Sequence, residues 1–120
     1  MLALLITLPA CGRIQQNQSQ SVSVTLEMIL EPEQPAVGPA QLIFTLTDEQ
    51  GQPINDAALA VEGNMTHAGM VPVVSQAEVG ETGHYVVPFE WTMGGDWVVT
   101  VETTLANGRH FSREFPVTVQ

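Results

Sequence analysis

The residues best suited to chemistry in this chain of 120 residues lie in one short segment, where Met65, His67 and Met70 fall within six positions. In an extended backbone Met65 and His67 point the same way because side chains alternate, and Gly69 allows the chain to turn Met70 toward them. Thioether sulfur is soft and uncharged and favours Cu(I), whereas imidazole binds several metals. The spacing therefore predicts a Cu(I) site, with packing of the Met side chains in a hydrophobic core as the alternative.

Two further residues are candidate auxiliary ligands of this site. Met93 lies in the segment Thr92-Met93-Gly94-Gly95-Asp96-Trp97, with core packing as the alternative, and His84 begins a strand-like segment, with an edge position as the alternative. Either Trp91 or Trp97 can shield a monovalent ion with its ring face through a cation–π contact. Met28 stands alone in an apolar segment and is predicted to be a core residue.

The charge balance excludes several classes of function. The chain has thirteen acidic residues, three Arg and no Lys, and its formal net charge is −10. A chain of this sign cannot neutralise a phosphate backbone, so a nucleic-acid partner is not expected. The single cysteine excludes an internal disulfide and a zinc site built from several Cys residues. No nucleophile elbow, phosphate-binding loop or paired-carboxylate motif is present, and we therefore expect no enzymatic activity.

The N-terminal residues resemble a bacterial lipoprotein signal. The apolar run Leu2–Leu8 is too short to span a bilayer but fits the hydrophobic region of a signal peptide. It is followed by Leu8-Pro9-Ala10-Cys11-Gly12, which resembles a lipobox. We predict a signal peptide over residues 1–10, lipidation of Cys11, a polar tether over residues 11–21 and a folded domain over residues 22–120, anchored in the extracytoplasmic cell envelope. A buried cysteine is the alternative for Cys11.

The remainder of the chain has the pattern of an all-β domain. Short segments with apolar residues at alternate positions are separated by Gly, Pro, Asn and Asp, and no long amphipathic helix is evident. Seven strands in about a hundred residues predict an immunoglobulin-like β-sandwich of antiparallel strands. The predicted strands are Val22–Leu30, Gln41–Asp48, Ala57–Glu62, Val71–Ala77, Gly83–Trp91, Asp96–Leu105 and Arg109–Val119.

The alternation also predicts which side chains share a face. Three sets are expected to point into the core, and a bulge is expected before Phe115 in the last strand, with Val117 and Val119 on opposite sides of a less regular end. The three sets are Leu42, Phe44 and Leu46; Tyr85, Val87 and Phe89; and Trp97, Val99 and Val101.

Several motifs together resemble a known family. In order they are Gly51-Gln52-Pro53-Ile54, the Met-x-His-x-x-Met segment, Gly83-His84-Tyr85, and Met93-Gly94-Gly95-Asp96-Trp97. Over Gln41–Val119 the chain is similar to the YtkA-like domain, which is related to the FixH family. The resemblance implies a small extracytoplasmic β-sandwich, tethered to the membrane, with a link to copper supply for respiratory oxidases.

Two functions from different classes follow. In the first, the protein is a lipid-anchored copper-handling protein that binds Cu(I) and passes it to a copper-receiving protein. In the second, it is a metal-free interaction module tethered to the membrane, whose Met and Trp side chains form an exposed apolar patch on one face. The arrangement of these side chains discriminates between the two, because a metal site requires them to converge.

Overall fold

The computed structural model describes residues 24–66, 71–77 and 81–120, and within these ranges all regular structure is β-strand. All seven predicted strands are confirmed, with ends that differ by a few residues; the third continues beyond Glu62 to Met65. The strands are β1 (Thr25–Glu31), β2 (Gly38–Thr47), β3 (Ala58–Met65), β4 (Val73–Ala77), β5 (His84–Trp91), β6 (Gly95–Thr104) and β7 (His110–Val119).

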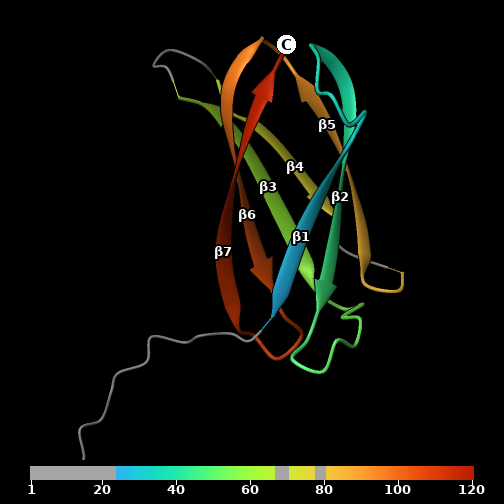
Figure 1. Ribbon diagram of the computed structural model, residues 1–120. Coiled ribbons are helices and arrows are strands. Elements are labelled where there is room, and N and C mark those ends of the chain that lie inside the picture. The colour runs from blue at the N-terminus through green and yellow to red at the C-terminus, as the bar shows by residue number, and fades with distance from the viewer. Residues whose placement is uncertain (1–23, 67–70, 78–80) are drawn as a thin grey trace, which may run out of the picture.

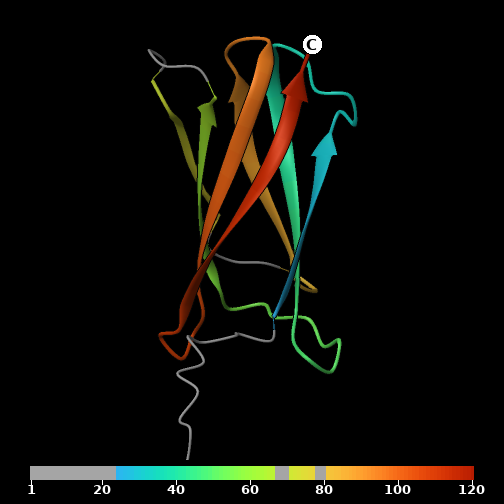
Figure 2. The ribbon, with the colours of Figure 1, turned by 60° about the vertical axis from the view of Figure 1, so that its left-hand side comes forward.

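The strands form two antiparallel sheets that face each other. One sheet has the order β1-β2-β5 and the other the order β4-β3-β6-β7. The chain changes sheet between β2 and β3, between β4 and β5, and between β5 and β6, and Figures 1 and 2 show the resulting two layers. The predicted immunoglobulin-like sandwich is therefore confirmed. None of the described residues form a helix that is long and apolar enough to cross a membrane.

The core lies between the two sheets and is built from the predicted alternating residues. All three predicted inward-facing sets are buried. Three aromatic rings meet edge to face at one end of the core, with centroid separations of 4.8 Å for Phe89 and Trp91, 5.2 Å for Trp91 and Trp97, and 6.4 Å for Phe89 and Trp97. Tilted and edge-to-face pairs of this kind add to the stability given by apolar burial.

The last strand differs from the prediction. The pairing of β6 with β7 runs without a bulge from Thr104 opposite His110 to Gly95 opposite Val119. Val117 and Val119 consequently share the inward face, and both are buried. Arg113 occupies an inward position of this edge strand but remains exposed, with its guanidinium 4.9 Å from the centre of the Phe111 ring. The charged residue interrupts the apolar pattern without interrupting the strand, which is why a bulge was wrongly expected.

A buried tyrosine ties the β2–β3 connection to the start of β5. The Tyr85 hydroxyl donates a hydrogen bond to the Ile54 carbonyl oxygen at 2.6 Å and accepts one from the Ala57 amide at 3.1 Å. Tyr85 has no exposed surface. Desolvation by burial raises the pKa of its hydroxyl above the ordinary value of 10.0; the hydrogen bond with Ala57 opposes this shift and the charge of Asp56 adds to it.

Gly83 completes the same structural unit. Its amide donates to the Asn55 side-chain oxygen at 2.5 Å, and its carbonyl accepts from the Leu46 amide at 2.8 Å. Gly83 has a φ of +74°, and a Cβ atom there would lie 2.8 Å from the Leu46 carbonyl oxygen and 2.9 Å from Pro53. Only glycine fits this backbone and this space. The Gly83-His84-Tyr85 motif therefore has a structural role, which is to hold the β2–β3 connection.

Candidate functional site

Met65 is the last residue of β3 and lies at one end of the sandwich. It is half-buried, follows Leu59, Val61 and Gly63 on the inward face, and packs against the hydrophobic core. In the sheet it is paired with Trp97 of β6. A Cβ atom added to Gly95 would lie 2.7 Å from the Met65 methyl carbon, so the end of the thioether side chain lies directly against Gly95. Glycine at position 95 provides the space that Met65 occupies.

Met93 lies in the β5–β6 turn at the same end of the sandwich. Its side chain is 53% exposed, and its carbonyl oxygen accepts a hydrogen bond from the indole nitrogen of Trp97 at 3.0 Å. Because Met93 precedes Gly95 by two residues and Gly95 contacts Met65, the fold brings two of the predicted ligands to one end. One thioether is half-buried and the other is open to solvent. This donor set is neutral and soft, which suits Cu(I) better than a hard divalent ion.

Both tryptophans are buried at the end of the sandwich that carries Met65 and Met93. Trp91 and Trp97 are each 1% exposed, and their rings pack against each other with an interplanar angle of 77°. They occupy inward positions of β5 and β6, where burial of a large aromatic ring is favourable. Trp97 is paired with Met65 and hydrogen-bonded to the Met93 carbonyl, so it lies beside both methionines, and shielding of an ion by its ring face stays a prediction. Among the described residues, neither tryptophan contributes to the exposed patch of Met and Trp side chains that the interaction hypothesis expects.

After Met65, Thr66 is also hydrogen-bonded to β6. The Thr66 amide donates to the Asp96 carbonyl oxygen at 3.1 Å. The Asp96 carboxylate accepts a hydrogen bond from the Thr118 hydroxyl at 3.0 Å, which directs that carboxylate toward β7. The other two residues of the predicted cluster, His67 and Met70, lie outside the described residues, as do Cys11 and the predicted signal peptide and tether.

His84 is not brought to the end that carries the two methionines. It is the first residue of β5, whereas Met93 follows the last, so that at about 3.3 Å per residue the length of the strand separates them by roughly 23 Å. The imidazole is exposed, and its Nδ1 lies 3.2 Å from the Thr45 hydroxyl. In residues 24–66, 71–77 and 81–120 no three His, Cys, Asp or Glu side chains are grouped so as to hold a metal ion.

Sequence reasoning missed two features of the surface. The first is the role of Gly95, which the sequence shows only as part of a motif. A glycine at the start of a strand, two residues before a Trp, is a signal that a neighbouring side chain fills the place where a Cβ atom would be. Alternation also identifies the outward positions of each strand. Ile29, Ile43 and Val86 occupy outward positions of their strands, and an apolar residue at such a position is a signal that can be read from the sequence.

The fold and the site define a small immunoglobulin-like β-sandwich domain with thioether side chains at one end. The family model described as YtkA-like matches residues 16–102, and the chain belongs to this family. A comparison with curated protein sequences found no match.

The solved structures with a similar fold include the following two. One is the soluble domain of PmoD from Methylocystis sp. ATCC 49242 (Rockwell), with a TM-score of 0.51 and 13% identity over 81% of this chain and 90% of that one. The other is the C-terminal domain of ZirS, with a TM-score of 0.50 and 11% identity over 100% of this chain and 86% of that one. At these identities the likeness concerns the fold alone.

Proposed function

We propose that this protein is an extracytoplasmic, lipid-anchored copper-handling protein without enzymatic activity, which binds Cu(I) and passes it to a copper-receiving protein. The observation that carries the proposal is that Met65 and Met93 lie at the same end of the sandwich, with the Met65 methyl group against Gly95, two residues after Met93. Membership of the YtkA-like family agrees with it.

The chemistry of the donors supports a site that exchanges its metal. Thioethers bind Cu(I) without carrying charge, so they select a soft monovalent ion and discriminate against hard divalent ions. The acidic chain, with a net charge of −10, attracts cations toward its surface from distances greater than those of direct metal–ligand bonds. Met65 is partly shielded by the core, while Met93 is exposed and accessible to a partner. In this proposal His67 and Met70 supply the remaining ligands, and lipidation of Cys11 holds the domain at the membrane.

The proposal is tested by a Cu(I) titration of residues 21–120, which include every described strand, under reducing conditions against a competing chelator. The variants Met65→Leu and Met93→Leu remove the sulfur atoms and keep apolar side chains of similar volume. Each is expected to weaken one-to-one binding by tenfold or more, equivalent to about 1.4 kcal/mol. His67→Ala and Met70→Leu extend the same test to the other predicted ligands.

Met28→Leu is the matched control. Met28 is half-buried in β1, lies opposite Phe44 and packs against the core away from the β5–β6 turn. Its replacement is expected to leave the affinity for Cu(I) unchanged. Equal affinities for the wild type, Met65→Leu and Met93→Leu would overturn the proposed site and favour a metal-free interaction module.

A further inference from the structure

A row of apolar side chains crosses the outer face of the three-stranded sheet. The strand pairing places Ile29 of β1 beside Ile43 of β2, and Ile43 beside Val86 of β5. Ile29 is 53% exposed, Val86 is 52% exposed and Ile43 is half-buried. Outward positions of an antiparallel sheet are ordinarily polar. Three large adjoining apolar residues therefore form a continuous apolar band on the surface.

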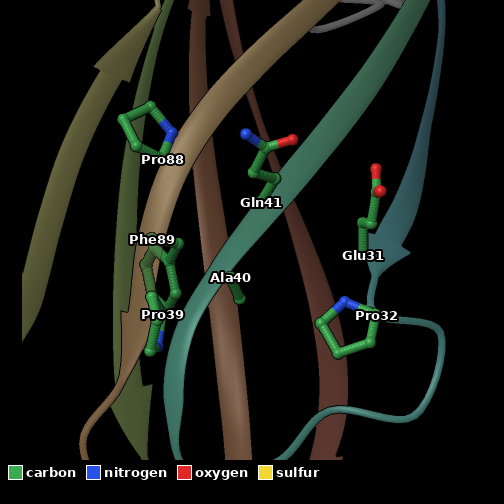
Figure 3. A pocket seen from close by; sticks show the side chains of 7 residues that line it. All are labelled: Glu31, Pro32, Pro39, Ala40, Gln41, Pro88 and Phe89. Carbon is green, nitrogen blue, oxygen red and sulfur yellow. The ribbon is translucent and has the colours of Figure 1, made fainter.

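A shallow groove adjoins this band. The neighbouring row consists of Glu31, Gln41 and Pro88, which the pairing also aligns across the three strands. The groove has a volume of about 660 Å³, and Figure 3 shows the side chains around it, which come from β5, β2 and the end of β1. It is lined by Glu31, Pro32, Pro39, Ala40, Gln41, Pro88 and Phe89. The apolar band and the groove together make up what we call the outer face of the β1-β2-β5 sheet.

The charges on this outer face have a single sign. Glu27, Glu31 and Glu90 are exposed at its outward positions. No outward position of β1, β2 or β5 is Lys or Arg; the two Arg residues of the described chain, Arg109 and Arg113, lie in the β6–β7 turn and in β7 of the other sheet. These three exposed carboxylates therefore favour a ligand that carries positive charges beside its apolar side chains, and they repel an acidic ligand.

The outer face of the four-stranded sheet lacks an equivalent row at its centre. There the pairing aligns Val74, Glu62, Thr100 and Glu114 in that order. Val74 is 67% exposed, but a carboxylate separates it from the rest of the sheet. The apolar band is thus a local property of the β1-β2-β5 sheet, and Val74 provides a matched control for its residues.

We propose that the outer face of the β1-β2-β5 sheet docks a segment of a partner protein whose apolar side chains are flanked by Lys or Arg. The apolar band takes the apolar side chains, and the three carboxylates pair with the cations. A second copy of this chain is disfavoured as the occupant, because two such faces would bring like carboxylates together and both chains carry a net charge of −10. The proposal does not depend on metal binding.

The test uses metal-free, isotopically labelled residues 21–120 at low salt and two short synthetic peptides of equal length. One peptide alternates Lys and Val, and the other alternates Glu and Val. Binding of the Lys–Val peptide is expected to shift the amide resonances of β1, β2 and β5, whereas the Glu–Val peptide is expected not to bind. Ile29→Lys and Val86→Lys are expected to weaken the binding by tenfold or more. Val74→Lys makes the same change of charge on the other sheet and is expected to weaken it much less.

Each contrary outcome overturns the proposal. Equal weakening by Val74→Lys means that only net charge matters, and shifts confined to the four-stranded sheet place the binding elsewhere. A dimer in sedimentation that Ile29→Lys dissolves identifies a second copy as the occupant. Flotation with zwitterionic vesicles that Ile29→Lys abolishes identifies a lipid surface. Because all of these measurements use metal-free protein, their result is independent of the Cu(I) titration.

Discussion

Replacing Tyr85 by Phe removes one oxygen atom from the most connected buried polar group in the described part of the chain. The hydroxyl donates to the Ile54 carbonyl at 2.6 Å and accepts from the Ala57 amide at 3.1 Å, and the side chain has no exposed surface. The ring that packs in the core is retained, so no large cavity forms. The change in the free energy of unfolding therefore measures the two hydrogen bonds that hold the β2–β3 connection to β5.

The magnitude follows from these two contacts. A net contribution of about 0.5–1.5 kcal/mol for each hydrogen bond gives a loss of about 1–3 kcal/mol. Ala57 is only 1% exposed, so its amide would be left without a partner and with little access to water. We therefore expect the loss to lie in the upper part of this range, about 2–3 kcal/mol. For a domain of this size, a loss of 2 kcal/mol lowers the Tm by roughly 8–16 °C.

Urea unfolding followed by tryptophan fluorescence measures this loss, because Trp91 and Trp97 are both buried and become exposed on unfolding. Thr45→Val is the control, since it removes an exposed hydrogen bond with His84 and is expected to cost less than about 0.5 kcal/mol. Tyr85→Phe can be compared with this control only if the slope of the unfolding free energy against urea concentration is unchanged. If Tyr85→Phe then lowers the free energy of unfolding no more than Thr45→Val does, the two hydrogen bonds of Tyr85 do not stabilise the β2–β3 connection.

Two further predictions concern stability. Tyr85 is the only tyrosine of the chain, and because burial raises its pKa in the folded state above the ordinary 10.0, the native protein retains this proton where the unfolded chain has lost it. Its contribution to stability is therefore fully present below pH 10 and is lost as the pH rises through the higher folded pKa; phenolate absorbance that appears at the ordinary pKa without unfolding would contradict this. Thr103 has no exposed surface, and its hydroxyl has no hydrogen-bond partner among the described residues. Thr103→Val is therefore expected to raise the free energy of unfolding by about 1 kcal/mol in the same urea assay, and a loss of stability would show that the hydroxyl has a partner in solution.

Much of the fold was determined by the sequence alone. Apolar residues at every second position, separated by turn-forming residues, predicted all seven strands and the inward faces, because alternation is a local property of the extended backbone. The prediction was wrong in β7, where Arg113 occupies an inward position. Since β7 is an edge strand, a long charged side chain there reaches solvent while the strand continues without a bulge.

The candidate site was determined only in part by the sequence. The residue types suited to Cu(I) were visible in the segment that begins at Met65. Which other candidate ligands lie near Met65 depends on the pairing of strands that are distant in the chain. The register of β3 with β6 brings Met65 against Gly95 and thus near Met93, whereas the length of β5 leaves His84 at the other end. Burial of Trp91 likewise follows from packing between sheets.

The same physical reason applies to close packing and to the outer face. A Cβ atom at Gly63 would overlap the ring of Phe89, and this contact joins residues of different sheets. Ile29, Ile43 and Val86 each appear in the sequence as single apolar residues at outward positions, and only the register between their strands makes them one band. Periodicity is a local property and can be read from consecutive residues. Strand register and packing depend on contacts between segments that are distant in the sequence, and the sequence alone does not show which segments pair.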